Sequence, residues 1–238
     1  MSRPEDIEVF AEHGHNWWTT DRYLVRALKA LVKPRMKWFG RVAGPWSRQR
    51  VLDLGCGGGF MAEAMAEKGA RVIGVDPALP AIEAARDHAA ARHLGILYQA
   101  GRAEAIPLAD ASMDRVVCVD VFEHVDDVKR CCREIARVLR PGGHLLFDTV
   151  NRTAIARWIM IDLYERVLGV APPGTHNSRQ FIRPEELRRH LEAEGLACGR
   201  FVGLGPLGFN WRGDPVFARW PILAMNYMGL ATRRGWGA

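Results

Sequence analysis

Short apolar runs alternate with longer amphipathic stretches between residues 50 and 150. Five runs have the length and the Val, Ile and Leu content of buried strands, at residues 50–55, 71–76, 96–101, 114–120 and 144–150. Three stretches between them carry apolar residues at helical spacing and end on glycine, at residues 60–69, 80–95 and 128–143. Strands separated by helices of this length pair in parallel through right-handed crossovers. The pattern predicts an α/β fold with a doubly wound, mainly parallel sheet.

Both flanks of this block are largely helical by pattern. Residues 5–42 are expected to be helical, with Pro34 marking a break or a new start. An apolar and basic helix is expected at 153–169, and another begins at Pro184. Two strands, at 197–204 and near 220–230, are expected to finish the chain. The expected organisation is an N-terminal helical cap (1–49), a ligand-binding core (50–152), an insertion or lid (153–183), and a C-terminal helix with strands that complete the sheet (184–238).

Composition narrows the class of protein. The 238 residues are 48% hydrophobic and 25% charged, which is too apolar for a disordered chain. No apolar run approaches the ~20 residues of a membrane-spanning helix. The first residues are acidic where an export signal would be basic. Five cysteines without metal-ligand spacing indicate reduced thiols, and so a cytoplasmic location.

The net charge of +6 is unevenly distributed along the chain. Residues 51–151 are net acidic, whereas the segments before and after them are net basic. Because no dense basic stripe is present, a nucleic-acid partner is not expected. Two explanations remain for the basic flanks: ordinary solvated surfaces, or a face turned toward anionic lipid.

The run VLDLGCGGGF is the most specific signal in the sequence. Asp53 ends the first strand, and the glycines that follow, among them Gly55, Gly57 and Gly59, let a ligand lie against the backbone. A dinucleotide-binding turn would place its third glycine where this chain has Phe60. An acid beside that turn would also repel a pyrophosphate, whereas it would attract the amino group and sulfonium of S-adenosylmethionine.

Asp76 ends the second strand, 21 residues after Gly55. A carboxylate at this position can accept hydrogen bonds from both hydroxyls of a ribose. The alternative is that Asp76 caps the helix that begins after Pro77. The strand, the glycine turn and the spacing agree on the ribose role, with Pro77 beside it in the cofactor site.

These residues, with GRAEAIPL after the third strand and LRPGGHLLFDTVNR at the fifth, resemble the class I S-adenosylmethionine-dependent methyltransferases over residues 50–150. In that family an acid after the third strand often binds the adenine amino group. Here the position is Arg102, so the resemblance implies that the backbone at Ala103 or Glu104 makes that contact, or that Arg102 stacks on the adenine.

A narrower resemblance covers most of the chain. Several segments look like those of the ubiquinone-biosynthesis O-methyltransferases: the tryptophan pair at 17–18, the run around Glu123, the segments TVNR and PPGTHNSRQFIRP, and the run NYM at 226–228. That likeness implies methylation of a phenol or catechol hydroxyl on a polyprenylated ring at the inner membrane surface. It also implies that Arg35 faces the methionine carboxylate and that Val119 lines the cofactor pocket.

Methylation of a phenol at neutral pH requires help, because a phenol has a pKa of ~10. Asp120, Glu123 and His124 follow the fourth strand, at the edge where doubly wound sheets bind ligands. They could hold Mg²⁺, which would lower the pKa of a catechol. Without metal, His124 is the expected base, with Glu123 beside it. His176, in a Pro/Gly loop, could close over the acceptor; the alternative roles are helix capping and a surface histidine.

Residues 153–169 and the tryptophan- and arginine-rich C-terminus have a composition suited to a lipid interface. The alternative is a helix that covers the active site with its apolar face. For function, the rivals to O-methylation of a phenolic small molecule are methylation of another acceptor at oxygen, nitrogen or carbon, a nicotinamide-dependent oxidoreductase, and a binding protein without turnover.

Overall fold

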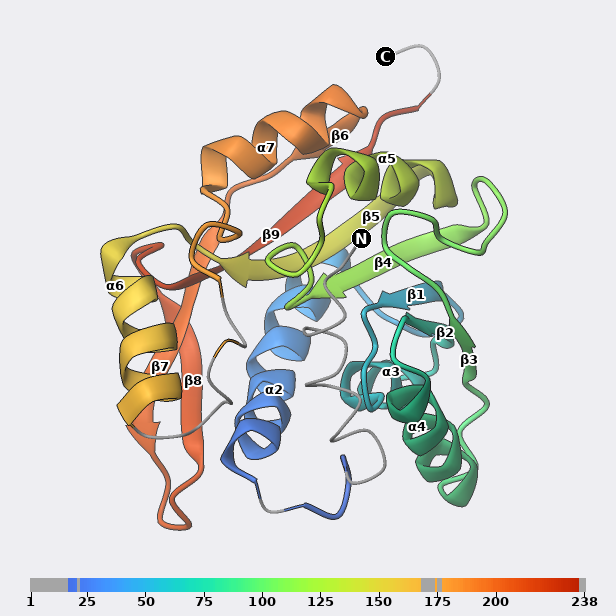
Figure 1. Cartoon of the computed structure of the whole chain (residues 1–238). Helices are drawn as coiled ribbons and strands as arrows, with labels where there is room; N and C mark the ends of the chain where they lie inside the picture. The colour runs from blue at the N-terminus through green and yellow to red at the C-terminus, as the bar shows by residue number, and fades with distance from the viewer. Residues whose placement is uncertain (1–16, 21, 168–173, 175–176, 236–238) are drawn as a thin grey trace.

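The computed structural model describes residues 17–20, 22–167, 174 and 177–235. Its parallel strands are β1 (Arg50–Leu54), β2 (Arg71–Asp76), β3 (Leu97–Ala100), β4 (Met113–Val119) and β5 (Leu139–Val150). They lie in the order β3-β2-β1-β4-β5, and each neighbouring pair is parallel. The predicted doubly wound, mainly parallel sheet is confirmed (Figure 1).

The C-terminal strands extend the sheet in antiparallel fashion. β9 (Asn226–Arg233) pairs with β5, and β6 (Leu196–Cys198), β7 (Val202–Phe209) and β8 (Pro215–Trp220) follow from it. The expectation of two strands in this region was wrong, because a turn between β7 and β8 was missed. In that turn Asn210 Oδ1 accepts hydrogen bonds from the N–H groups of Arg212 (2.8 Å) and Asp214 (2.9 Å).

Helices cover both faces of the sheet (Figure 1). On one face lie α5 (Val128–Val138) and α7 (Pro184–Ala193), and on the other lie α2 (Tyr23–Ala43), α3 (Phe60–Ala66) and α4 (Leu79–Ala91). A separate buried apolar cluster fills each side: one includes Ile135 and Leu187, the other Phe39 and Met65. The sheet is thus buried on both faces, as its continuous apolar strands predict.

Pro34 lies inside α2 and neither breaks nor restarts the helix, contrary to expectation. Proline removes one intrahelical hydrogen bond and crowds the preceding turn. The buried stripe of α2, which includes Leu31, Arg35 and Phe39, continues on both sides of Pro34. Packing of that stripe keeps the helix continuous, since tertiary burial stabilises helices more than local propensity does.

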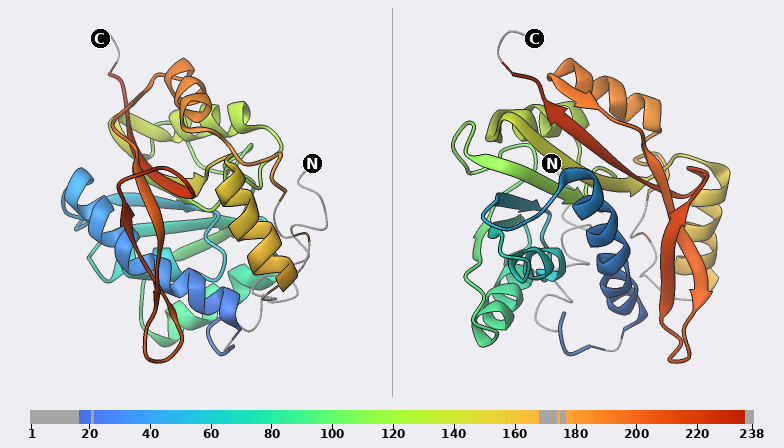
Figure 2. Two further views of the ribbon diagram at one scale, coloured as in Figure 1. Left: turned by 90° about the vertical axis from the view of Figure 1, so that its left-hand side faces the viewer. Right: turned by 180° about the vertical axis from the view of Figure 1, so that it is seen from behind.

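The insertion after β5 is helical, as expected. It comprises α6 (Ala154–Arg157) and the π-helix η2 (Trp158–Val167). The β7–β8 hairpin extends past the body of the sheet and packs along α2 (Figure 2). Among the described helices, none has the length and apolar character needed to cross a membrane.

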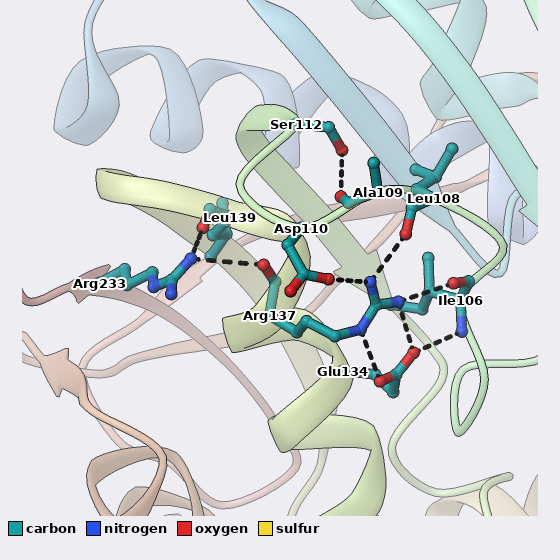
Figure 3. Close-up of polar contacts among 9 residues, drawn as sticks. All are labelled: Ile106, Leu108, Ala109, Asp110, Ser112, Glu134, Arg137, Leu139 and Arg233. Atoms are coloured by element: carbon teal, nitrogen blue, oxygen red, sulfur yellow. Dashed lines mark hydrogen bonds and ion pairs between the residues drawn. The ribbon is translucent and has the colours of Figure 1, made fainter.

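The loop after β3 is anchored to the end of α5 by Arg137 (Figure 3). The Arg137 guanidinium donates to the backbone carbonyls of Ile106 and Leu108, each at 2.8 Å, and binds Asp110 at 2.7 Å. Glu134 binds the same guanidinium at 2.8 Å and accepts the N–H of Ile106, also at 2.8 Å. This network holds the loop after β3 against α5. Arg102 and Ala103, which lie earlier in the same loop, line the cavity described next.

Candidate active site

A cavity of about 250 Å³ lies at the carboxyl ends of β1, β2 and β4. β1 is the strand with β2 on one side and β4 on the other, so the cavity is at the point where the strand order reverses. Doubly wound sheets bind ligands at this point, because the loops diverge there and leave a crevice. Among the predicted site residues that the structure describes, all but Gly59 line the cavity: Arg35, Asp53, Gly55, Gly57, Asp76, Pro77, Arg102, Ala103, Val119, Asp120, Glu123 and His124.

The cavity has two chemically different halves. We call the part around Asp53, the glycine loop and Asp76 the nucleotide half. The acceptor half is the apolar part formed by α2, η2 and the antiparallel strands, and it includes Leu31, Met160, Tyr164, Leu204, Phe217 and Asn226. A polar half joined to an apolar half suits two ligands of different character that react where the halves meet.

Two glycines of the loop, Gly55 and Gly58, leave no room for a side chain. A Cβ at Gly55, whose φ is 75°, would overlap Val121. A Cβ at Gly58 would lie 2.6 Å from Cγ of Trp17, which is buried and lines the cavity. Trp18 donates from Nε1 to the carbonyl of Gly58 at 2.8 Å. The two tryptophans therefore pack on the cofactor loop, a role that the sequence pattern did not identify.

Gly59 is not among the residues that line the cavity, and its cofactor contact stays a prediction. It precedes α3 with a φ of 89°, and a Cβ there would lie 2.5 Å from the Tyr98 hydroxyl. Its role is to turn the chain into the helix and to let Tyr98 pack beneath the loop. His176 lies outside the described residues.

Asp53 and Asp76 place two buried carboxylates around the loop. Asp76 accepts hydrogen bonds from the N–H groups of Gly57 and Ala78, each at 2.9 Å. Burial raises the pKa of Asp76. Asp53 is 1% exposed, and burial raises its pKa to about 7. Neither oxygen of Asp53 has a hydrogen bond of normal geometry among the described residues, and the one backbone group that acts on it, at Ala62, lowers its pKa less than burial raises it. A cationic ligand group would meet this unsatisfied carboxylate.

Arg35 is a buried ion-pair centre between the two halves. Its Nε donates to Asp148 at 2.5 Å and its Nη2 to Asp120 at 2.6 Å. Burial lowers the pKa of Arg35, but the two carboxylates outweigh this and raise it above its usual value. The bonds of Arg35 to described residues use Nε and Nη2, which leaves Nη1 for a ligand carboxylate. Asp120 sits at a φ of 53°, a left-handed conformation held by this pairing.

Glu123 and His124 follow β4 at the junction of the two halves. The carboxyl group of Glu123 is 3% exposed and accepts a hydrogen bond from Thr149 Oγ1 at 2.7 Å. Burial, reinforced by the charge of Asp120, raises the pKa of Glu123 to about 8. His124 lines the cavity beside it. The structure thus brings together the acid and the imidazole that the sequence singled out.

The magnesium site suggested by Asp120, Glu123 and His124 is not formed. Within the described ranges, no three His, Cys, Asp or Glu side chains gather in a way that could hold a metal ion. Asp120 is paired with Arg35, and Glu123 is buried against Thr149. These carboxyl groups already have partners, so the residues as arranged do not fit a metal, and no step is derived through one.

Arg102 and Ala103 reach the cavity from the loop after β3, at the position expected for the adenine. The Arg102 guanidinium lies within 4.0 Å of the carboxylates of Glu104 and Asp126. Ala103 is buried, with 8% of its surface exposed. The adenine contact itself stays a prediction.

Comparison with known proteins agrees with this geometry. A family model described as "Methyltransferase domain" matches residues 52–147. Proteins named "Ubiquinone biosynthesis O-methyltransferase" are 34% identical in Ralstonia nicotianae and 39% in Paracidovorax citrulli; each alignment covers 97% of this chain, and 94% and 95% of the relative.

Solved structures share the fold at low sequence identity. Magnesium protoporphyrin IX methyltransferase from Synechocystis has a TM-score of 0.68 at 16% identity, over 95% of this chain and 97% of that one. A possible histamine N-methyltransferase from Thermotoga maritima has a TM-score of 0.67 at 20% identity, over 96% of this chain and all of that one.

The similarities decide against the nicotinamide alternative. Phe60, which stands where a dinucleotide-binding turn has its third glycine, and the buried carboxylate of Asp53 agree with S-adenosylmethionine as the cofactor. The residues of the nucleotide half fit S-adenosylmethionine. The chain is an S-adenosylmethionine-dependent methyltransferase of class I, and it belongs to the family of the ubiquinone-biosynthesis O-methyltransferases.

Proposed function

We propose that this enzyme methylates a hydroxyl group of a phenol or catechol, and that the acceptor is a polyprenylated quinone precursor. The observation that carries the proposal is the junction of the cavity. There a carboxyl group of raised pKa and an imidazole lie between a polar half and an apolar half. The names of the relatives favour the same acceptor class.

The nucleotide half supplies the contacts that hold the cofactor. Asp76 would accept hydrogen bonds from the ribose hydroxyls, Asp53 would face the amino group, and Arg35 would pair with the methionine carboxylate. S-adenosylmethionine, when bound, supplies an electrophilic methyl group on its sulfonium. Trp17 packs on the glycine loop and lines this region, so it would cover part of the bound cofactor.

Transfer to a hydroxyl forms one carbon–oxygen bond, breaks the carbon–sulfur bond and releases one proton. That proton needs a base at the junction, and His124 and Glu123 are the candidates. At neutral pH Glu123 holds its own proton, because burial keeps its pKa near 8. His124 is therefore the proposed base, and the hydrogen bond from Thr149 holds the Glu123 side chain in place beside it.

The decisive experiment is methyl transfer to a panel of catechols and polyprenyl phenols. We expect turnover of at least one catechol, with amines and carbon acids of similar size left unreacted. Methylation of only the amines or carbon acids would replace the proposal with the alternative acceptor class. His124→Ala should lower turnover by roughly 10²-fold or more and leave cofactor affinity unchanged. Equal activity of the variant would remove His124 from the mechanism.

A pH profile separates the two candidate bases. A base must be unprotonated, so the rate rises with pH through the pKa of the base. If Glu123 were the base, kcat would rise through about pH 8. If it is not, Glu123→Gln should keep the position of the rise in kcat. A rise that disappears in Glu123→Gln would assign the base to Glu123.

We also propose a weak contact with an anionic membrane surface. Three large apolar side chains are exposed: Trp158 on η2, and Phe209 and Trp211 at the β7–β8 hairpin. The same elements also contribute residues to the lining of the acceptor half. Arg157, Arg166 and Arg212 stand beside them. Aromatic and arginine side chains together suit the headgroup region of a bilayer, where a polyprenyl chain would be anchored.

Sedimentation with anionic liposomes tests this contact. The protein should pellet at low salt and less at high salt, because the basic part of the attraction is screened. Trp211→Ser should weaken pelleting. Leu97→Ser, on the exposed edge strand β3, is the matched control and should not. Absence of pelleting at low salt would contradict the contact without touching the methyltransferase activity.

A further inference from the structure

Asn226 is the one buried polar side chain of the acceptor half, among the described residues, whose acceptor atom is unsatisfied. It is the first residue of β9, is 7% exposed and lines the cavity. Its Oδ1 is buried and has no hydrogen-bond partner among the described residues. A buried amide oxygen without a donor costs free energy, and such groups in native proteins need an explanation.

The described residues next to Asn226 in the sheet offer its Oδ1 no side-chain donor. In the sheet it stands opposite Val150 of β5 and Leu204 of β7, whose side chains carry no polar atoms. The preceding residue, Met225, is apolar and also lines the cavity. The residues that pair with Asn226 in the sheet thus leave Oδ1 without a donor, and a molecule bound in the cavity that Asn226 lines could supply one.

A second asparagine at the same end of the sheet shows the contrast. Asn151, just past β5, is also 7% exposed, but its Nδ2 donates to the carbonyl of Leu223 at 2.5 Å. Asn151 is not among the residues that line the cavity. Its amide serves the fold, whereas the amide oxygen of Asn226 has no partner among the described residues and belongs to a side chain that lines the cavity.

We infer that Asn226 orients the methyl acceptor by accepting a hydrogen bond from a hydroxyl that is not methylated. An amide oxygen accepts a hydrogen bond but is too weak a base to take the proton of the reacting hydroxyl. The reacting hydroxyl belongs to the junction with His124, and a neighbouring hydroxyl on the same ring serves Asn226. This inference rests on the proposed function and sharpens it: the acceptor carries a second hydroxyl group.

Paired acceptors and two variants test the inference. The acceptors are a catechol with a short alkyl chain and the monophenol with the same chain. The wild-type enzyme should prefer the catechol. In Asn226→Ala and Asn226→Leu the KM for the catechol should rise about tenfold, as expected for one lost hydrogen bond, and the preference should shrink by the same factor. The alanine variant leaves space in the cavity, so it separates the lost bond from a steric block.

Stability and cofactor affinity distinguish this role from a structural one. Asn226→Leu should melt no lower than the wild type, because its Oδ1 has no bond to lose. Asn151→Leu, the matched control, should melt lower, since it leaves the Leu223 carbonyl without its donor. Calorimetry with S-adenosylhomocysteine should give the same Kd for the wild type and both Asn226 variants.

Each contrary outcome has a distinct meaning. An unchanged catechol preference in both Asn226 variants would overturn the inference, and so would a melting temperature that falls as far as in Asn151→Leu. Failure of Asn226→Leu to fold would also overturn it, because it would show a structural bond. If the wild-type enzyme methylates no phenol or catechol, the proposed function fails first, independently of Asn226.

Discussion

The two halves of the cavity come from different kinds of sequence. The nucleotide half is made by three short turns, each directly after a parallel strand: residues 53–60, 76–78 and 101–104. The acceptor half is assembled from α2, η2 and the antiparallel strands, which lie far apart along the chain. A cofactor held against backbone demands glycines and acids at fixed spacing, whereas an apolar wall demands only apolar residues. The first half leaves a motif in the sequence and the second does not.

Arg35 joins the two halves, and its loss should have the largest effect. Arg35→Met would leave the carboxyl group of Asp148 buried without its ion pair. We expect a loss of about 3–5 kcal/mol in the free energy of unfolding, measured by urea denaturation. Arg41→Met, on the exposed side of the same helix, is the control and should change little. A loss below about 1 kcal/mol would mean that the ion pair does not hold the two halves together.

Substitution of Asp76 should weaken cofactor binding in the nucleotide half and leave the fold intact. Asp76→Ala should weaken S-adenosylmethionine affinity by roughly a hundredfold, since it deletes the ribose contact and frees the N–H groups of Gly57 and Ala78. Titration calorimetry measures this, with circular dichroism to show that the fold remains. Asp87→Ala, exposed on α4, should bind normally. Unchanged affinity in Asp76→Ala would discredit the ribose assignment.

Asp53 gives the nucleotide half a pH dependence that the acceptor half lacks. With its pKa raised to about 7, Asp53 is mostly protonated at pH 6 and mostly ionised at pH 8. A cationic amino group prefers the ionised form, so affinity for S-adenosylhomocysteine should weaken about tenfold from pH 8 to pH 6. Asp53→Asn should flatten this dependence. A slope that persists in Asp53→Asn would place its origin elsewhere.

The raised pKa of Asp53 also makes the stability of the ligand-free fold depend on pH. A carboxyl whose folded pKa lies above its unfolded value stabilises the fold most when protonated, so its contribution is lost as pH rises through the folded pKa. Burial places Asp53, near 7, and Glu123, near 8, in this class. The ligand-free enzyme should therefore melt at a lower temperature at pH 8 than at pH 6, and Asp53→Asn should reduce the difference.

A substitution in the acceptor half should have the smallest effect on activity, and it should leave cofactor affinity unchanged. Phe217→Ala removes an apolar wall of that half from β8. We expect kcat/KM for the acceptor to fall severalfold, up to about tenfold, with the cofactor Kd unchanged. Phe209→Ala, exposed on the same hairpin and outside the cavity lining, is the control in assays without membranes. A change in cofactor affinity in Phe217→Ala would contradict the division into halves.

The parallel part of the fold could be predicted because its periodicity is local. The five strands and the helices between them follow from apolar runs and glycine stops, and the structure confirms that each element exists. One boundary was wrong: the helix expected at 128–143 ends at Val138, and β5 begins at Leu139. Pro34 and the β7–β8 turn were misread for opposite reasons. Packing of the α2 stripe overrides the proline, and a turn built on Asn210 has no distinctive dipeptide that would mark it.

The residues of the candidate site were likewise only partly predictable from the sequence. Asp53, Asp76 and the first glycines were identified because their spacing reflects a requirement of the backbone, and the structure gathers them around one cavity. Gly59 shows the limit of this signal, because a glycine that faces Tyr98 and one that faces a ligand look alike in sequence. The packing of Trp17 against Gly58 and the unsatisfied oxygen of Asn226 depend on contacts between distant segments, which no local pattern records.

By itself the sequence determined the parallel core and the nature of the cofactor, because a nucleoside lying on a strand-to-helix turn restricts which residues can stand there. Only the tertiary structure decided how Arg35 is paired, that the three expected metal ligands do not gather, and which side chains wall the acceptor. Those features depend on which distant groups are buried together, and burial sets both the charge a carboxyl group carries and the partners it can find.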